Sequence, residues 1–321
     1  MNVLIIKISS MGDILHTLPA LTDAMNMLVN IRFDWVIEEN FAQIPTWHPA
    51  VCQVFPVALR RWRYNWFNTE TIQELFNFTF QLQKKKYEII IDAQGLIKSA
   101  ALVAFVHGEK HGLDYKSARE PLASFFYNQR HTVAKQQHAI KRIRQLFSNS
   151  LSYILSDNLI DYAITHYFKS KLISKNPYLI FLHSTTHIRK HWPESHWRLL
   201  IAFTNESGYR IKLPWGSNDE YQRSYRLAQG YSHVEILLSH SLMQIAEQLI
   251  GATAIVSVDT GISHLAAALN CPNLTLYGPT DPNLIGVHGR YQKILRAKDG
   301  NMKNLTAVSV WQALQTILTS K

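Results

Sequence analysis

Residues 253–269, TAIVSVDTGISHLAAAL, place a strand pattern, a glycine turn and a helix pattern in immediate succession. The part before Asp259 is apolar and β-branched, as is typical of a strand buried on both faces, and the part after Gly261 suits a helix. Such a turn directs unpaired backbone N–H groups and the positive end of the helix dipole at a ligand above the sheet, most often a phosphate. The simpler alternative is that Asp259 or Thr260 only caps the helix.

Length and composition describe a globular chain with room for two domains. The sequence has 321 residues, of which 47% are hydrophobic and 17% are charged. No apolar run approaches the ~20 residues that cross a bilayer, and Lys7 interrupts the apolar N-terminal segment, so we expect a mature strand there and not a signal peptide. Only two cysteines occur, which gives no disulfide framework and no metal-binding spacing and suits a reducing cytoplasm.

The net charge of +10 suits an anionic partner, either nucleic acid or a membrane surface. Basic residues are spread over both halves, and no nucleic-acid-binding fold pattern accompanies them. The cluster RRWRYNW, residues 60–66, has no acidic neighbours in the sequence. The guanidiniums of Arg60, Arg61 and Arg63 suit carboxylates and phosphates, and Trp62 and Trp66 suit sugar faces or lipid head groups.

Strand and helix patterns alternate along the first half, which indicates parallel βαβ units and a doubly wound sheet. Two of the strands lead into glycine turns, at Gly12 and Gly95, and the pattern weakens between residues 108 and 129. The expected elements are strands at 3–8, 33–38, 53–57 and 87–91, a helix beginning at 14, helices at 73–85, 96–106 and 134–146, and a loop at 59–68.

The second half repeats this rhythm, so the sequence predicts an α/β protein with two doubly wound domains, residues 1–170 and 171–321, with the boundary between 165 and 177. Ligand-binding turns at the carboxyl edges of two such sheets predict a site in a cleft between the domains. Residues 308–319 are expected to form an amphipathic helix that packs back on the first domain. The other expected elements are strands at 178–182, 210–213, 234–238 and 273–277 and helices at 193–205, 218–228 and 242–250.

Asp13 directly follows Gly12 in the first glycine turn. A positioned carboxylate at this point suits a general base that removes the proton of an attacking alcohol, which contributes roughly 10²–10⁴-fold to a rate. The alternative is a carboxylate that only stabilises the start of a helix through its dipole, by about 0.3–1 kcal/mol.

Residues 183–193, HSTTHIRKHWP, connect a predicted strand to a predicted helix. The hydroxyls of Thr185 and Thr186 suit phosphate oxygens, and Lys190 suits the charge that builds on a leaving group. The alternative is a solvated polar loop. Because the chain has no Walker A sequence, no Gly-x-Gly-x-x-Gly and no Asp-x-Asp pair, we expect a metal-free electrostatic clamp.

Two further residues are candidates because of their spacing. His264 lies four residues after Thr260, on the same helix face and near the expected phosphate, although it is equally typical of a neutral core histidine. Glu220 follows a predicted strand and suits the hydroxyls of a ribose, with a surface glutamate as the alternative.

Five motifs, in this order, resemble those of the bacterial lipopolysaccharide heptosyltransferases of glycosyltransferase family nine, over nearly the whole chain. Any one of them alone is weak, but their order and combination are specific. The motifs are SSMGDILHTLP at 9–19, DAQGLIKSA at 92–100, KHWPE at 190–194, SVDTGISHL at 257–265 and YGPTDP at 277–282.

The resemblance implies a GT-B architecture, in which two Rossmann-like domains face each other across a cleft. It implies an inverting transfer of L-glycero-D-manno-heptose from ADP-heptose to the Kdo of Kdo-lipid A in inner-core lipopolysaccharide synthesis. Domain 1–170 would bind this acceptor and domain 171–321 the nucleotide sugar. The implied partners are the donor, the acceptor and the inner-membrane surface, with no nucleic acid, no metal and no further cofactor. The implied location is cytoplasmic, peripheral on the cytoplasmic face of the inner membrane.

The resemblance also implies roles for single residues. Asp13 would be the catalytic base, and Lys190 would act in catalysis as a ligand of the donor phosphate. The implied donor-binding residues are Thr185, Thr186, Lys190, Glu220, Asp259, Thr260, Gly261 and His264, and the implied acceptor-binding residues are Arg60, Arg61, Arg63 and Arg119.

Two rival functions stay open. One is an enzyme of the same architecture with another nucleotide-sugar donor, such as a UDP-sugar transferase or epimerase, or the enzyme of the heptosyltransferase II step. The other is a non-catalytic basic protein that binds nucleic acid or anionic lipid with strong salt dependence. The second rival leaves Asp13 and the second glycine turn unexplained.

Overall fold

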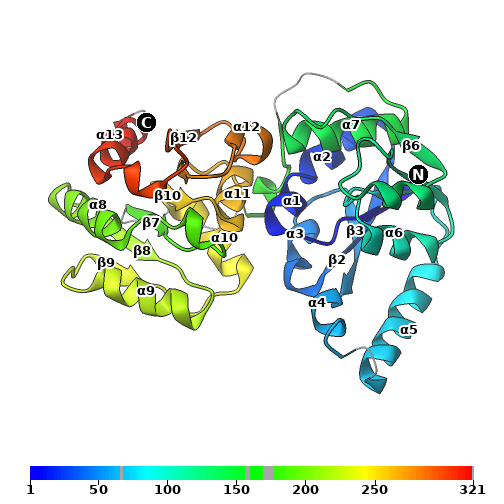
Figure 1. The fold of residues 1–321 in the computed structure, drawn as a ribbon, viewed down its shortest axis with the longest axis horizontal. Helices are drawn as coiled ribbons and strands as arrows, with labels where there is room; N and C mark the ends of the chain where they lie inside the picture. Colours follow the sequence, from blue (N-terminus) through cyan, green and yellow to red (C-terminus); the bar gives the residue numbers. More distant parts are fainter. Residues whose placement is uncertain (66–67, 156–159, 169–176, 320–321) are drawn as a thin grey trace. The chain divides into compact units, whose positions relative to one another are not determined.

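The structure is a computed structural model that describes residues 1–65, 68–155, 160–168 and 177–319. The chain divides into two compact units, Met1–Ile164 and Thr165–Lys321, and each unit has a parallel sheet with helices around it (Figure 1). The predicted boundary after residue 170 lies outside the described residues. Two parallel α/β units confirm the predicted fold class.

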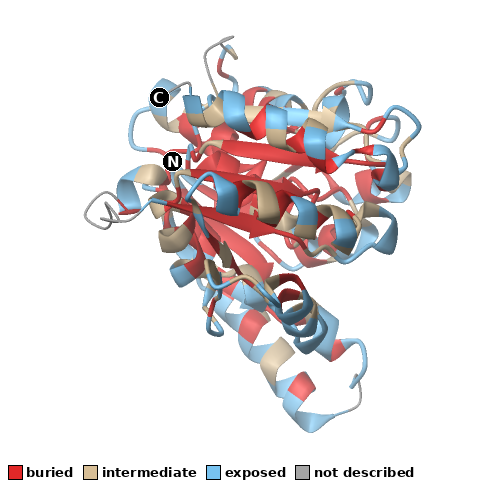
Figure 2. Cartoon of the chain, turned by 90° about the vertical axis from the view of Figure 1, so that its left-hand side faces the viewer, coloured by how far each residue is buried: buried red, intermediate tan, exposed pale blue. Residues whose placement is uncertain are grey.

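The sheet of the first unit has the strand order β3-β2-β1-β4-β5-β6, and every neighbouring pair is parallel. The central strands are apolar and almost completely buried because helices cover both of their faces. Across the chain, Figure 2 shows buried strands in red between helices whose outer surfaces are exposed. The strands are β1 (Asn2–Ile6), β2 (Arg32–Glu38), β3 (Val51–Val57), β4 (Ile89–Asp92), β5 (Glu109–Leu113) and β6 (Gln129–His131).

The helices of the first unit mostly match the predicted positions, with two corrections. The expected loop at 59–68 begins with a short helix, whose Trp62 is buried in the core with Phe78 and Val103. The helix expected from residue 134 begins only at Ala139, where the His138 side chain accepts a hydrogen bond from the N–H of Ile140. The helices are α1 (Met11–Leu15), α2 (Leu18–Met27), α3 (Gln43–Thr46), α4 (Leu59–Trp62), α5 (Thr69–Gln83), α6 (Ile97–Ala104) and α7 (Ala139–Leu151).

The sheet of the second unit has the order β12-β11-β10-β7-β8-β9, again with parallel pairs. When the strands of each unit are numbered from one to six along the chain, both sheets have the order 3-2-1-4-5-6, with the second sheet read from β9 to β12. The strands are β7 (Tyr178–Leu182), β8 (Arg210–Leu213), β9 (Val234–Ile236), β10 (Ala254–Val258), β11 (Asn273–Tyr277) and β12 (Gln292–Arg296).

The second unit has its own core, in which Trp192 and Trp197 pack with strand residues such as Val256. The C-terminal helix α13 packs against α8 and β10 and buries Val310 and Leu314 in this core. The helices are α8 (Glu194–Glu206), α9 (Asn218–Ala228), α10 (Leu242–Gly251), α11 (Gly261–Ala268), α12 (Pro282–Ile285) and α13 (Ala307–Thr319). Within the described ranges, no helix has the length and apolar character that a bilayer span requires.

Candidate functional site

Both sheets have a point where the strand order reverses, between β1 and β4 in the first unit and between β7 and β10 in the second. At such a point the loops after the two central strands diverge to opposite faces and leave room for a ligand at the carboxyl edge. Asp13 follows β1 and Asp92 ends β4, while Lys190 follows β7 and Asp259 follows β10. The topology therefore places the candidate side chains at the ligand-binding edge of each sheet.

Asp13 is fixed at the start of α1 by the residue that precedes the helix. Its Oδ2 atom accepts hydrogen bonds from the backbone N–H and the hydroxyl of Ser10, at 3.0 and 2.9 Å. Behind it lies the ammonium of Lys7, which is buried and donates to the carbonyl oxygen of Ala93 at 2.9 Å. The carboxylate is thus held by local contacts and faces a buried positive charge.

The electrostatic surroundings keep Asp13 ionised. Burial alone would raise its pKa, but the charge of Lys7, the two hydrogen bonds from Ser10 and the charge of Arg119 outweigh burial and lower the pKa. Burial lowers the pKa of Lys7, and Asp13 and Asp92 act against this shift. At neutral pH a carboxylate is therefore available to accept a proton.

Asp92 shapes the neighbouring turn, and its carboxylate forms its hydrogen bonds inside the protein and not with solvent. Its Oδ1 accepts from the N–H groups of Gln94 and Gly95, and its Oδ2 accepts from the hydroxyls of Ser99 and Tyr127, at distances of 2.7–3.1 Å. Gln94 in turn accepts from the N–H groups of the two residues after Lys7, at 3.1 and 3.3 Å. The second motif thus fixes the backbone of the turn that leads to Asp13.

In the second unit, Lys190 and Asp259 form an ion pair in which Nζ and Oδ2 lie 2.7 Å apart. The hydroxyl of Thr280 also donates to Asp259 Oδ2, at 2.6 Å, and the hydroxyl of Thr185 donates to the Asp259 carbonyl oxygen, at 2.9 Å. The carboxylate of Asp259 is therefore turned toward Lys190 and Thr280. Three motifs that are far apart in the sequence meet at this point.

Helix α11 begins directly after this cluster, with Thr260 as its N-cap residue and Gly261 as its first residue. The Ser263 hydroxyl donates to the Thr260 carbonyl oxygen at 2.6 Å and holds the first turn. His264 is buried in the same turn. The N-terminal N–H groups of α11 and the ammonium of Lys190 together form an anion-binding arrangement.

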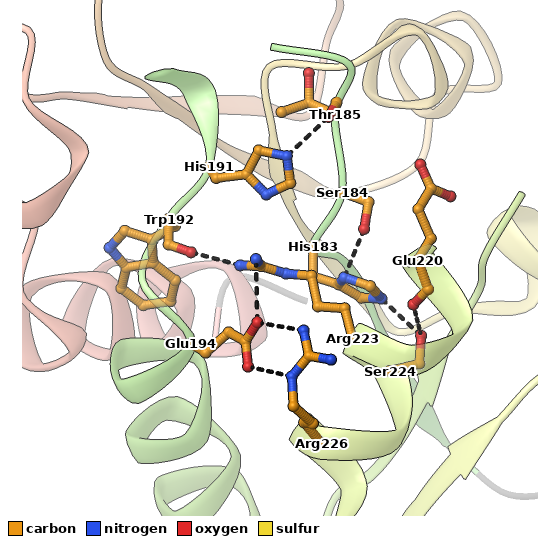
Figure 3. A network of polar contacts seen from close by, with 10 residues as sticks. All are labelled: His183, Ser184, Thr185, His191, Trp192, Glu194, Glu220, Arg223, Ser224 and Arg226. Carbon is orange, nitrogen blue, oxygen red and sulfur yellow. Dashed lines mark hydrogen bonds and ion pairs between the residues drawn. The ribbon is translucent and has the colours of Figure 1, made fainter. Parts of the chain in front are cut away.

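The loop after β7 is held from behind by His183, which is buried at the end of the strand (Figure 3). Its Nε2 lies 2.9 Å from the hydroxyl of Ser224 on α9, and its Nδ1 lies 2.8 Å from the hydroxyl of Ser184. Because the Ser224 hydroxyl donates to the Glu220 carbonyl oxygen, it accepts from Nε2–H, and Nδ1 accepts from Ser184. Burial, followed by the charge of Arg223, lowers the pKa of His183 to about 3, so the ring is neutral.

Two more contacts hold this loop. Within the loop, His191 contacts the Thr185 carbonyl oxygen at 2.8 Å through Nε2, and Arg223 of α9 donates to the Trp192 carbonyl oxygen at 2.7 Å (Figure 3). Arg223 and Arg226 both bind Glu194, the first residue of α8. The loop that carries Thr185 and Lys190 is therefore built as a rigid edge of the second unit.

Six of the eight predicted donor-binding residues lie at this edge, and the other two, Thr186 and Glu220, lie at its periphery. Thr186 is exposed on the loop after β7. Glu220 lies in the first turn of α9, where its Oε2 accepts from the N–H of Gly216 at 2.7 Å. The residues at the carboxyl ends of β7 and β10 are Thr185, Lys190, Asp259, Thr260, Gly261 and His264.

The arginine cluster on α4 differs from its sequence-based interpretation. Arg61 forms ion pairs with Glu39 at 3.3 Å and with Glu74 at 3.0 Å. The statement that residues 60–66 have no acidic neighbours therefore holds for the sequence and not for the fold, because the partners come from η1 (Glu39–Phe41) and from α5. Trp62 donates to Glu74 and is buried, so its ring offers no face to a ligand. Trp66 lies outside the described residues.

The other predicted acceptor residues are exposed. Arg60 lies 5.6 Å from the ring of Phe41, and Arg63 lies 4.6 Å from the ring of Tyr64. Arg119 follows β5 and not β3, and its charge acts on Asp13 and Lys7. Arg119 is therefore grouped with the candidate base and not with the α4 arginines.

Sequence reasoning missed two residues that shape the site. Lys7 was interpreted only as an interruption of an apolar run, although a lysine directly after a strand with four consecutive buried residues signals a polar or charged partner. Thr280 belongs to the YGPTDP motif but was given no role. The described residues contain no group of three or more His, Cys, Asp or Glu side chains placed to hold a metal ion.

Two Rossmann-like units with polar turns at their reversal points, together with a match to a heptosyltransferase structure over nearly the whole chain, identify a glycosyltransferase of the GT-B class. The sequence model of glycosyltransferase family 9 (heptosyltransferase) matches residues 75–314. The chain belongs to this family.

Relatives support the assignment over nearly the full length. Lipopolysaccharide heptosyltransferase 1 of Escherichia coli strain K12 is 54% identical over 319 residues, which are 99% of this chain and 100% of the relative. The structure of E. coli heptosyltransferase WaaC with ADP superposes with a TM-score of 0.96 at 54% identity and covers 99% of this chain and 100% of that one. The structure of the same protein with ADP-2-deoxy-2-fluoro heptose gives 0.93 at 53% identity, covering 98% and 99%.

Proposed function

We propose that the chain transfers L-glycero-D-manno-heptose from ADP-heptose to the Kdo of Kdo-lipid A, with inversion at the anomeric carbon. Support comes from the full-length similarity to a lipopolysaccharide heptosyltransferase 1 and from a relative bound to a fluorinated ADP-heptose. The observation that carries the proposal is the Lys190–Asp259 pair at the N-terminus of α11, an arrangement suited to a sugar diphosphate.

The proposed reaction is a single displacement. The acceptor hydroxyl of Kdo attacks the anomeric carbon of heptose on the face opposite to ADP, and Asp13 accepts the hydroxyl proton as the new C–O bond forms. The bond between the anomeric carbon and the phosphate oxygen breaks, and its electron pair leaves with ADP. Asp13 suits this role because its carboxylate is ionised and is fixed by Ser10.

The leaving diphosphate gains negative charge in the transition state. We propose that Lys190 and the N–H groups at the start of α11 stabilise this charge electrostatically, as a clamp that works without a metal. We propose that Asp259, once Lys190 turns to the phosphate, binds hydroxyls of the heptose, and that Glu220 binds the ribose. Thr185 and Thr186 would bind phosphate oxygens, with Thr260, Gly261 and His264 beside them.

The acceptor carries phosphates and carboxylates, for which arginine is the best-suited side chain. We propose that Arg60, Arg61 and Arg63 bind these groups and that Arg119, near Asp13, binds the Kdo carboxylate. An acceptor of this kind is anchored in lipid, so we propose a cytoplasmic protein that is peripheral on the inner membrane.

One assay tests the proposal directly. The protein is incubated with ADP-heptose and Kdo-lipid A, and the product mass is expected to increase by one heptose. A product formed only from an acceptor that already carries a heptose would support the heptosyltransferase II step. Transfer from a UDP-sugar, or a larger thermal shift with UDP than with ADP, would support another donor. Salt-sensitive binding without any turnover would support the non-catalytic rival.

A further inference from the structure

Helix α5 presents an apolar stripe to solvent. Ile72, Phe76 and Phe80 are 55%, 68% and 52% exposed. Their spacing of four residues places them on one face of the helix. The rings of Phe76 and Phe80 are parallel, with centroids 6.4 Å apart. Figures 1 and 2 show this helix as a projection at the lower end of the first unit.

The stripe has no structural role in the core of its own unit. The opposite face of α5 supplies that role, since Thr71, Phe78 and Leu82 are the buried residues of the helix. Phe105, at the end of α6, is also exposed, and its carbonyl oxygen accepts a hydrogen bond from Gln83 of α5 at 3.1 Å. Three large exposed apolar side chains that follow one another on one helix face form an apolar surface.

The charges around the stripe are positive. Lys84, Lys85 and Lys86 follow the helix directly, and the ammonium of Lys84 lies 4.6 Å from the ring centroid of Phe80. The acidic residues of α5 are Glu70, in its first turn, and Glu74, which binds Arg61 and Trp62. Aromatic rings next to lysines on one helix face are the pattern by which a helix lies on an anionic bilayer.

We propose that α5 lies on an anionic lipid bilayer, with the stripe of Ile72, Phe76 and Phe80 in the interface and Lys84 and Lys86 on the lipid phosphates. Glu74 of α5 binds Arg61 and Trp62 of α4, so the two helices are held together. A bilayer that contacts α5 would therefore have Arg60 and Arg63 at the level of its head groups. The inference rests on the proposed function in that it deepens the proposed location on the inner membrane: it identifies α5 as the surface that contacts lipid.

Vesicle binding of the full chain tests the proposal. The fraction that sediments with phosphatidylcholine vesicles, with and without phosphatidylglycerol, is measured for the wild type and for variants. We expect binding to the anionic vesicles, and a loss on the order of tenfold for Phe76→Ser with Phe80→Ser, because two large apolar side chains no longer enter the interface. Lys84→Gln with Lys86→Gln should lose roughly tenfold at low salt and less at high salt. Lys85 is left in place because it binds Asp34.

A matched control replaces exposed apolar side chains of the second unit, Leu199→Ser with Val308→Ser, and should bind as the wild type does. Thermal unfolding confirms that each variant is folded. Equal vesicle binding by the wild type and the phenylalanine variant, or no binding by the wild type, overturns the proposal. So does a wild-type dimer that becomes monomeric in this variant, since the stripe then binds a second copy.

Turnover separates this proposal from the proposed function. With a soluble Kdo acceptor that lacks acyl chains, the phenylalanine variant should keep the wild-type turnover. Absence of turnover in the wild type and in every variant would contradict the proposed function. Vesicle binding would still decide whether α5 contacts the bilayer.

Discussion

Lys190 Nζ lies 2.7 Å from Asp259 Oδ2, so the cation proposed to bind the donor phosphate already has an anionic partner. A diphosphate must compete with this carboxylate for the ammonium, and it brings more negative charge than the carboxylate has. The two side chains should therefore have opposite effects on nucleotide binding.

Lys190→Ala should weaken ADP binding about tenfold or more, because a charge-assisted hydrogen bond to phosphate is lost. Asp259→Asn should bind ADP at least as tightly as the wild type, because a competing negative charge is removed, while its turnover with ADP-heptose falls. Titration calorimetry measures both affinities, with Lys303→Ala as a control for a lysine elsewhere in the unit. An equal loss of ADP affinity in the two variants would contradict the competition.

Asp13→Asn should lower turnover by roughly 10²–10⁴-fold, because the amide does not accept the hydroxyl proton. ADP affinity should not change, since Asp13 belongs to the first unit and the proposed nucleotide-binding residues belong to the second. Steady-state turnover and calorimetry provide the two readouts. Turnover close to the wild-type value would place the base at another residue.

Lys7→Met should raise the pKa of Asp13, because the positive charge that lowers it most is removed. A protonated carboxyl group does not act as a base, so the acid limb of the pH profile of turnover should move to higher pH. Lys7→Arg keeps the charge and should leave the acid limb closer to that of the wild type. An unchanged profile in Lys7→Met would show that Lys7 serves the fold alone.

Arg60→Ala and Arg63→Ala should raise the KM for the acceptor far more than the KM for ADP-heptose. Arg61→Ala should have a smaller effect, because its guanidinium already binds Glu39 and Glu74. Its ion pairs are exposed and screened by solvent, so their loss should change the stability of the fold little. Initial rates with each substrate varied in turn give both constants, and a larger change in the donor KM would move the acceptor site away from α4.

His183 and His48 should make each unit less stable in acid. Burial lowers the pKa of His183 to about 3 and that of His48 to about 4, from an ordinary value of 6.5. At pH values between 6.5 and the lowered pKa of each histidine, the unfolded chain binds a proton that the folded chain does not. The free energy of unfolding therefore falls as the pH falls, by about 1.4 kcal/mol per pH unit for each histidine.

Denaturant unfolding of His183→Gln and His48→Gln checks this expectation. Each variant should show a shallower loss of stability below pH 6.5, and the effect of His48→Gln should end at a higher pH. The two histidines belong to different units, so each variant should alter the transition of its own unit. Parallel curves for wild type and variants would exclude the buried histidines as the cause of acid sensitivity.

β7 could be predicted because a buried parallel strand needs a continuous apolar run, and its sequence YLIFL is one. β8 and β11, in which polar and apolar residues alternate, also match the predicted ranges in full. The strands that were missed, β5, β6 and β12, lie toward the sheet edges and carry charged residues, such as Glu109 and Arg130. Their hydrogen bonds come from the neighbouring strand, and no local pattern of hydrophobic residues marks them.

The candidate site could be predicted as a set of turns but not as a set of contacts. Glycine turns and motif order placed Asp13 and Asp259 at strand ends, because topology determines where the carboxyl ends of parallel strands meet. The spacing of charged residues along the sequence does not show which of them form ion pairs with each other. The Lys190–Asp259 and Arg61–Glu39 pairs join segments whose proximity depends on the completed fold.

The common strand succession of the two sheets gives Asp92 and Asp259 matching places, one as the last residue of the fourth strand of its unit and the other directly after the fourth strand of its unit. The same framework uses the two carboxylates differently. In the first unit the carboxylate holds the backbone of its own turn, and in the second it is paired with a lysine. The sheets are thus interchangeable supports, and the turns at their carboxyl edges decide what each unit does.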